Sequence, residues 1–273
     1  MQALLLVGAV LLIFVSFFGT GRRRDGRAVE CVGSTSVQPF AEILSQEFER
    51  LPGGIRVDVE GGGSTAGIVA IDENIADIGM CSRSLKSDEA RQFVGIPIAL
   101  DGLAVVVHKS NPITGLTRQQ IRRIFCGDVS NWREVGGDNR PIHLITREEG
   151  SGTREAFVKL VMDAHGPGET AGRISPRAMA QESNGAVREL VRHDRGAIGY
   201  MSLGLVNAEL RIIEVDGVYP TVQEVVNKRY PLVRPFLFVT KGVPPPDAQA
   251  FINYVLSPAG QQLLRKEGLV GVR

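Results

Sequence analysis

The stretch Arg147-Glu148-Glu149-Gly150-Ser151-Gly152-Thr153-Arg154 joins a predicted strand to a predicted helix. An apolar run over residues 142–145 precedes it, and residues 156–161 follow it with helical periodicity. A strand, a Ser/Gly/Thr turn and a helix start in this order present backbone N–H groups and hydroxyls at a positive helix end. Arg147 adds a planar fork of donors that suits carboxylate or phosphate oxygens. Because no nucleophile with its base is present, the stretch predicts a site that holds an oxyanion.

Two further turns have a similar composition. Residues 33–36, Gly-Ser-Thr-Ser, and residues 61–67, Gly-Gly-Gly-Ser-Thr-Ala-Gly, each follow a predicted strand and open a predicted helix. In an open parallel sheet such turns gather at the carboxyl ends of the strands, where ligands bind. Taken singly, each hydroxyl would be an ordinary N-cap, which contributes about 1 kcal/mol. Three such turns, one of them beside Arg147, favour a shared binding site instead.

Strands and helices alternate along most of the chain, which predicts the α/β class with a mostly parallel sheet covered on both faces. The apolar stretch over residues 96–107 is interrupted by Asp101, and we expect it to carry the chain into a second domain. A second crossing near Tyr200 would return the chain to the first. The predicted units are lobe 1, residues 28–104 and 202–273, and lobe 2, residues 105–201.

The N-terminus has a different character from the rest of the chain. Residues 3–18 are almost all apolar, a run shorter than the about 20 residues that span a bilayer but close to a secretory h-region. No Lys or Arg precedes the run, and Arg22, Arg23 and Arg24 follow it, which reverses the usual charge bias. We therefore expect residues 1–27 to be a signal peptide or an N-terminal membrane anchor, and the protein to be periplasmic or otherwise extracytoplasmic.

Composition excludes several classes of protein. The net charge of +1 offers no electrostatic basis for binding nucleic acid. No metal-ligand spacing occurs, so we expect neither a metal nor another cofactor. The three cysteines, Cys31, Cys81 and Cys126, cannot all pair within one chain and are predicted to be buried thiols. A disulfide between Cys31 and Cys81 is possible only if the two strand ends lie side by side.

Enzymatic readings have little support in the sequence. Residues 61–66 match the dinucleotide pattern G-x-G-x-x-A, but the next strand ends in Cys81-Ser82 and not in an acidic ribose ligand. No Walker lysine follows a glycine loop. A nucleophilic serine needs a positioned base, and the histidines stand in no recognisable motif: His108, His143, His165 and His193. We therefore predict that the protein is not an enzyme.

The predicted site is rich in neutral donors and has a single arginine. Desolvating a small dianion is costly, so each of its oxygen lone pairs needs a partner. Hydroxyls and backbone N–H groups supply such partners without bringing like charges together. A tetrahedral oxyanion therefore fits this set of donors better than a nucleotide does.

Several short motifs occur together in the order and spacing of one known family. They are Gly33-Ser-Thr-Ser-Val, Gly61-Gly-Gly-Ser-Thr-Ala-Gly, Ala76-Asp-Ile-Gly-Met, Ile124-Phe-Cys-Gly-Asp with Asn131-Trp132, Arg147 with Gly150-Ser-Gly-Thr153, and Gly196-Ala-Ile-Gly-Tyr200. From about residue 29 to the C-terminus the chain resembles the phosphate-binding proteins of bacterial phosphate ABC importers. The resemblance implies the type II periplasmic-binding-protein fold, with two α/β lobes that are joined by hinge strands and close on one phosphate ion.

The resemblance also implies which residues hold the ligand. They are Ser34, Thr35, Ser36, Ser64, Ser82, Arg147, Ser151, Gly152 and Thr153. Ser82 occupies the place where the best-studied branch of the family carries an aspartate that accepts the proton of hydrogen phosphate. Asp101 and Glu149 are alternative acceptors, between which the sequence does not choose.

The implied function is capture of inorganic phosphate and its delivery to the membrane permease of an ABC importer, without catalysis. We expect the protein to act as a monomer. Two alternatives stay open at this point. One is a binder of another tetrahedral oxyanion, such as sulfate or molybdate, and the other is a phosphate-ester hydrolase that uses one of the serines.

Overall fold

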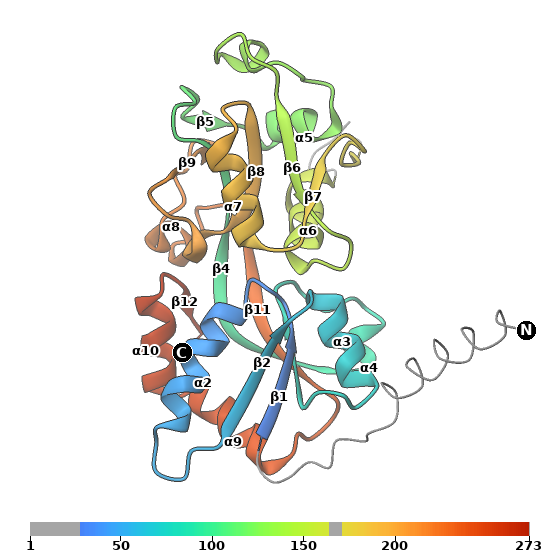
Figure 1. Ribbon diagram of the computed structural model, residues 1–273, viewed down its shortest axis with the longest axis vertical. Helices are drawn as coiled ribbons and strands as arrows, with labels where there is room; N and C mark the ends of the chain where they lie inside the picture. The colour runs from blue at the N-terminus through green and yellow to red at the C-terminus, as the bar shows by residue number, and fades with distance from the viewer. Residues whose placement is uncertain (1–27, 164–170, 273) are drawn as a thin grey trace, which may run out of the picture.

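The computed structural model describes residues 28–163 and 171–272, so the predicted signal peptide or anchor lies outside the described residues. Figure 1 shows two groups of helices and strands, one above the other, and two strands that connect the groups. These two strands are β4 (Val94–His108) and β11 (Val233–Thr240). We call the group that contains the first strand lobe 1 and the other group lobe 2.

Lobe 1 contains the N-terminal elements and the last helices. They are β1 (Ala28–Gly33), α2 (Gln38–Glu49), β2 (Arg56–Gly61), α3 (Ser64–Asp72), β3 (Ile78–Cys81), α4 (Glu89–Gln92), α9 (Pro246–Val255), α10 (Pro258–Lys266) and β12 (Val270–Gly271). The first helix follows from its pattern, because Phe40, Leu44 and Phe48 form one buried face and a proline stands in its first turn. Helix α2 thus lies where the sequence predicted a helix, directly after the turn at residues 33–36.

Lobe 2 contains the remaining elements. They are β5 (Gly115–Leu116), α5 (Arg118–Cys126), η1 (Trp132–Val135), β6 (His143–Arg147), α6 (Gly152–Phe157), η2 (Val158–Met162), β7 (Met179–Gln181), α7 (Asn184–His193), β8 (Ala197–Ser202), η3 (Leu203–Leu205), β9 (Leu210–Ile212), β10 (Glu214–Val215) and α8 (Val222–Val226). Helix α5 begins at a capping box in which the Thr117 hydroxyl accepts from the N–H of Gln120. Its left-handed C-cap, Gly127, ends the helix.

The main sheet has the strand order β2-β1-β3-β11-β4-β8-β6-β7. Pairing is parallel within β2-β1-β3 and within β8-β6-β7, but antiparallel wherever β4 or β11 takes part. The α/β class is therefore confirmed, with a mixed sheet in place of a mostly parallel one. The physical reason is that the chain ascends through β4 and descends through β11, so neighbouring strands at the crossing must run in opposite directions.

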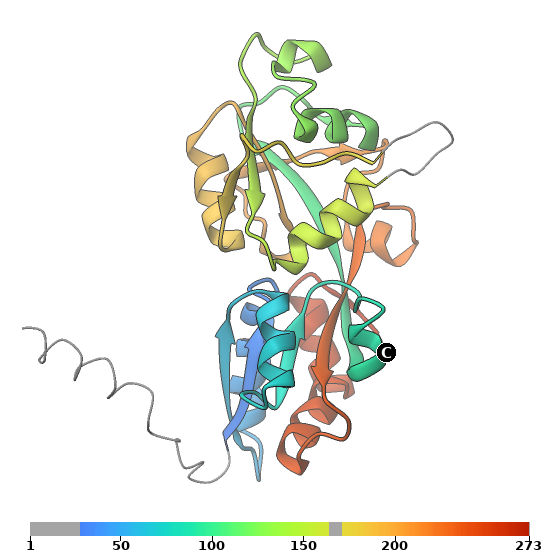
Figure 2. The same ribbon diagram turned by 90° about the vertical axis from the view of Figure 1, so that its right-hand side faces the viewer.

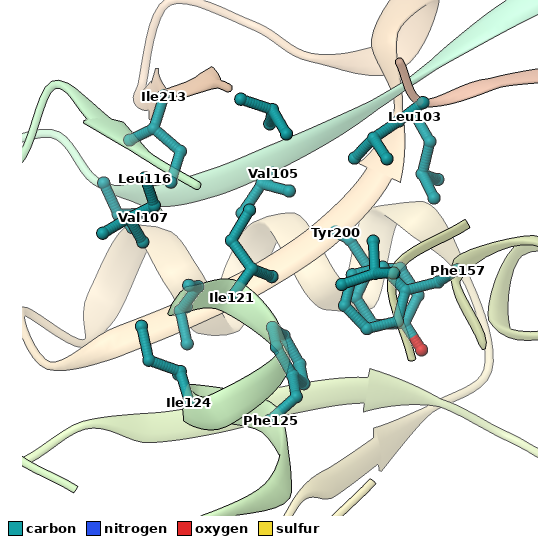
Figure 3. Packing of buried hydrophobic residues seen from close by; sticks show 14 of the residues in the cluster. Leu103, Val105, Val107, Leu116, Ile121, Ile124, Phe125, Phe157, Tyr200 and Ile213 are labelled. Atoms are coloured by element: carbon teal, nitrogen blue, oxygen red, sulfur yellow. The ribbon is translucent and has the colours of Figure 1, made fainter. Parts of the chain in front are cut away.

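Strand β4 shows how the two faces of the sheet are filled. Leu103, Val105 and Val107 point into the larger core of lobe 2, whereas Ala104 and Val106 point into a second cluster under α7. In the larger core, shown in Figure 3, the rings of Phe157 and Tyr200 stack at 3.9 Å between centroids. This stack joins α6 to β8 in the core of lobe 2.

The pairing of residues 210–232 favours a different boundary between the lobes from the predicted one. The sequence placed them in lobe 1, but β9 pairs with β4 and β10 pairs with β5. Val225, Tyr230 and Leu232 belong to the same buried cluster as Val105. We therefore propose that residues 210–232 belong to lobe 2 and that the chain returns at β11, whereas Gly204 lies against Phe40 of lobe 1. Sequence periodicity missed this because short strands and a five-residue helix carry little signal.

The cysteines are free thiols; Cys31 and Cys81 are buried as predicted, whereas Cys126 is only partly buried. Burial raises the pKa of both thiols. The register of β1 and β3 places Cys31 opposite Ile78, so the disulfide that the sequence left open is not formed. Across residues 28–163 and 171–272, no helix combines the length and the apolar composition needed to cross a membrane.

Candidate functional site

The polar turns of lobe 1 meet at one edge of the sheet. In the parallel ladders, Gly33 lies opposite both Gly61 and Met80, so β1, β2 and β3 end level with one another. The residues that follow them therefore come together. The side chains of Ser64 and Ser82 are fully buried there, and the Ser82 N–H donates to the Ser64 hydroxyl over 3.1 Å.

Lobe 2 supplies the opposite side of the site from the end of β6 and the start of α6. Arg147, Ser151 and Thr153 are each 1% exposed. Figure 2 shows α6 standing above α3 and the turns of lobe 1. A backbone hydrogen bond of 3.1 Å from the Thr65 N–H to the Gly150 carbonyl joins the two turns directly.

Side chains from both lobes also bond to one another inside the site. The hydroxyls of Ser36 and Thr153 lie 2.8 Å apart, and Arg147 Nη2 donates to the Thr35 hydroxyl over 3.0 Å. The structure thus brings the predicted residues of the two lobes together: Ser34, Thr35, Ser36, Ser64 and Ser82 from lobe 1 with Arg147, Ser151, Gly152 and Thr153 from lobe 2. We call these residues the interlobe site.

Gly152 lets the backbones approach closely. A Cβ atom at this position would clash with the Ser64 hydroxyl and would lie 2.7 Å from that of Ser82. Gly63, on the opposite side, has a φ of 92° and faces the backbone of Gly150. Glycines at these points therefore allow contact between the lobes that side chains would prevent.

Arg147 is the central cation of the site. Its Nε donates to Glu148 Oε2 and to the Gln181 carbonyl, both over 2.9 Å. Its Nη2 donates over 3.0 Å to Glu148 Oε1, to the Glu182 carbonyl and to Thr35. Among the described residues, the buried Nη1 has no hydrogen-bond partner. Since an unpaired buried donor is costly, this nitrogen marks where an anionic ligand would gain most.

The N-cap interpretation holds for only one of the three turns. Ser151 caps α6, where its hydroxyl accepts from the N–H of Arg154. The N-caps of α2 and α3 are Val37 and Gly63, which make no side-chain cap. In the first turn, Ser34 accepts instead from the N–H groups of Ser36 and Val37. The hydroxyls of Thr35, Ser36 and Ser64 are therefore not used to cap helices.

A second buried ion pair at the site escaped the sequence analysis. Arg234 on β11 donates from Nε to Asp101 Oδ2 over 2.9 Å, and from Nη1 to the Thr153 hydroxyl over 2.7 Å. Asn184 was missed too, and its amide donates to Ser36 Oγ over 2.9 Å. The sequence did contain a signal for the ion pair: Asp101 and Arg234 each stand inside an apolar strand. Charged residues at such positions are rarely buried unless they are paired.

Burial and pairing act in opposite directions on this pair. Burial raises the pKa of Asp101, and the neighbouring Arg234 opposes that shift. Burial lowers the pKa of Arg234, and Asp101 opposes that shift in turn. The charged forms therefore depend on each other in a site from which water is excluded.

Neither alternative proton acceptor has a free carboxylate in the site. The Glu149 side chain is 94% exposed and stands 3.7 Å from Arg154. Asp101 is buried, but its oxygens already accept from Arg234 and from the Ser202 hydroxyl. Glu148 pairs with Arg147. Within the described part of the chain, the interlobe site therefore offers donors much more readily than acceptors.

No histidine among the described residues serves the site serines as a base. His143 bonds to Asp194, His108 to Ser110, and His193 to the Glu189 carbonyl. Within the same residues, no group of His, Cys, Asp and Glu side chains could hold a metal ion. The chemistry of the interlobe site is thus that of hydrogen bonding and charge.

Comparisons with known proteins place the chain in a family. Residues 20–259 match the model of the PBP superfamily domain. The phosphate-binding protein PstS of Pseudomonas aeruginosa is 31% identical over 271 residues, an alignment that covers 88% of this chain and 81% of the relative. This relative bears out the family that the sequence motifs indicated.

Comparison with solved structures supports the same family. A protein of Clostridium perfringens, described as a phosphate ABC transporter substrate-binding protein with bound phosphate, superposes with a TM-score of 0.84 at 36% identity. The alignment covers 90% of this chain and all of that one, 100%. An ABC-type phosphate transport receptor from Vibrio cholerae gives a TM-score of 0.74 at 33% identity, with coverage of 89% and 99%. The predicted periplasmic-binding-protein fold is confirmed, and the chain belongs to the PBP superfamily and, within it, to the family of the phosphate-binding proteins PstS.

Proposed function

We propose that this protein captures inorganic phosphate between its two lobes and delivers it to the membrane permease of an ABC importer. The observation that carries the proposal is the buried Nη1 of Arg147, a charged donor without a hydrogen-bond partner among the described residues. It belongs to the same guanidinium that contacts Thr35 of the opposite lobe. An anion at this point would be bound by both lobes at once.

The proposed ligands are the residues of the interlobe site. The hydroxyls of Thr35, Ser36, Ser64, Ser82 and Thr153 and the guanidinium of Arg147 supply donors, while Ser151 and Gly152 shape the turn. Since Glu148 pairs with Arg147, the site holds an anion largely through oriented dipoles. Contacts to both lobes would favour the closed conformation over the open one, which is how ligand binding shifts such an equilibrium.

A second candidate ligand is another tetrahedral oxyanion, such as sulfate or molybdate. The observation that favours it is Ser82 at the place of the expected acid, together with the lack of a free carboxylate on Asp101 or Glu149. Without an acceptor for the proton of hydrogen phosphate, a fully deprotonated anion of the same shape is rejected less strongly. Serine-dependent hydrolysis has no such support, because none of the three described histidines contacts a site serine.

The test is isothermal titration calorimetry of the purified protein with phosphate and then with sulfate. We expect one phosphate to bind per chain, with sulfate weaker. Tight binding of sulfate with no signal from phosphate would contradict the proposal and favour the second candidate. Sedimentation analysis of the same sample would check the proposed monomer, and the N-terminal residue of the exported protein would tell a cleaved signal peptide from an anchor.

A further inference from the structure

Arg234 is held in place from several directions. On the paired strands β4 and β11, Asp101 and Arg234 stand directly opposite each other. Both Nε and Nη2 of the arginine lie 2.9 Å from the same carboxylate oxygen. The Ser202 hydroxyl donates to the other oxygen over 2.8 Å, and the ring of Phe236 lies 5.1 Å from the guanidinium carbon. The guanidinium therefore has little freedom to turn.

From this position Arg234 reaches both lobes. Its Nη1 donates over 2.7 Å to the Thr153 hydroxyl in lobe 2 and over 3.3 Å to the Ser82 carbonyl in lobe 1. A guanidinium can only donate, so the Thr153 oxygen must accept here. The hydroxyl hydrogen of Thr153 is thereby left to point at another acceptor. Ser36 Oγ lies 2.8 Å away, and either of these two hydroxyls can donate to the other.

The Ser36 hydroxyl is oriented in the same way by Asn184. The backbone N–H of Ser202 donates to the amide oxygen of Asn184 over 3.1 Å, which determines which end of the amide is its NH₂ group. That NH₂ group donates to Ser36 Oγ over 2.9 Å. Both hydroxyls thus have one lone pair occupied by a group that can only donate. A ligand that replaced the bond between them would find both hydroxyl hydrogens available.

We propose that Arg234, fixed by Asp101, is a positioning residue that forces the Thr153 hydroxyl to act as a donor to the bound oxyanion. This inference rests on the proposed function. Arg234 thereby links the strands that connect the lobes to the donor set of the site. Loss of Arg234 would free the Thr153 hydroxyl to rotate, so the anion would lose a pre-oriented donor as well as nearby positive charge.

The test is a double-mutant cycle between Arg234 and Thr153, read as the dissociation constant for inorganic phosphate. Arg234→Gln alone would leave Asp101 as an unpaired buried charge, so both members are replaced together, as Asp101→Asn with Arg234→Gln. Thermal unfolding checks that each variant is folded. We expect the paired replacement and Thr153→Val each to weaken binding at least about tenfold.

The variant that combines both changes shows whether Arg234 acts through Thr153. If Arg234 acts through Thr153, the combined variant should bind within about twofold of Thr153→Val alone. A matched control is the buried pair Arg83–Glu89, replaced by Arg83→Gln with Glu89→Gln, whose nitrogens and oxygens lie 2.6 Å apart at their closest. Among the described residues, this pair makes no hydrogen bond or ion pair with Thr153, so its effect should multiply with that of Thr153→Val.

Other outcomes would overturn the inference. If the losses from the Asp101/Arg234 replacement and from Thr153→Val multiply, Arg234 acts independently of Thr153. If the paired replacement lowers stability but leaves the dissociation constant unchanged, its role is structural only. Should the unmodified protein bind sulfate and not phosphate, the proposed function fails, while the same cycle measured with sulfate still decides the role of Arg234. Binding of neither anion contradicts both.

Discussion

The two buried arginines of the site differ in how they are held. Arg147 pairs with Glu148, the next residue in the chain, whose side chain is 27% exposed. Arg234 pairs with Asp101, which is 133 residues away and has a fully buried side chain. Water can screen the first pair but not the second. The same two chemical groups therefore have different uses, one at a ligand and one in the frame that supports it.

The two arginines have different functions: one is proposed to contact the ligand, and the other supports the site. Among the described residues, Nη1 of Arg147 has no hydrogen-bond partner, and we propose that the bound anion accepts from it. Arg234 lies between protein groups and orients a neighbouring hydroxyl. Substitutions at the first pair should be felt mainly in affinity, whereas those at the second should lower the stability of the fold as well as the affinity, which makes the comparison testable.

The largest effect is expected from Asp101→Ala. It leaves Arg234 charged and unpaired in a dry environment, which should lower the free energy of unfolding by about 3–5 kcal/mol. Denaturation by urea measures it. Glu148→Ala is the matched change at the other pair, and there partial exposure should limit the loss to about 1 kcal/mol. Equal losses in the two variants would remove the distinction between the pairs.

Arg147→Ala should act on affinity. It removes a buried charge-assisted donor, so binding of phosphate should weaken by at least about 2 kcal/mol. Calorimetry measures the dissociation constant. Arg154→Ala serves as control, since this neighbouring arginine is more exposed and stands 3.7 Å from a solvent-exposed glutamate. An unchanged dissociation constant in Arg147→Ala would mean that the site is elsewhere.

Gly152→Ala tests the closeness of the lobes. The added methyl group would collide with Ser64 Oγ, so closure on the ligand should become less favourable by about 1–3 kcal/mol. Small-angle X-ray scattering with and without phosphate would report closure, and calorimetry the affinity. Gly62→Ala is the control, because its nearest neighbour would be the Ala66 Cβ at 3.4 Å. If both variants bind alike, the close approach is unimportant.

The smallest effect is expected at Glu155, outside the site. Its carboxylate joins the lobes, 3.0 Å from both Arg83 Nε and Lys86 Nζ. Glu155→Gln should weaken phosphate binding by about 0.2–1 kcal/mol, and the difference should shrink at high salt because exposed charges are screened. Glu149→Gln provides an exposed control. A difference that does not depend on salt would argue against an electrostatic contact between the lobes.

Much of the site followed from local pattern. Gly33 to Ser36, Gly61 to Gly67 and Arg147 to Thr153 each combine a strand end with small polar residues, and parallel strands that end level must bring such turns together. The pairing of Glu148 with Arg147 also involves only neighbours in sequence. These features could be read because the physical cause lies within a few residues.

Other features of the fold and the site depend on contacts between residues far apart in the sequence. Residues 210–215 pair with β4 and β5 through short strands, which the sequence periodicity did not reveal. The Ser82 position raised the question of an acceptor, but only the packing showed that Asp101 is already engaged and that Glu149 points to solvent.

Strand and helix periodicity, the Ser/Gly/Thr turns and the place of Arg147 are encoded in short stretches of this chain. They were sufficient for the α/β class, the family and the kind of ligand. The Asp101–Arg234 pair and the orientation of the Thr153 and Ser36 hydroxyls arise only when strands distant in sequence pair. The reason is that a buried charge or a hydroxyl takes its role from the groups around it, and those groups come together only in the folded chain.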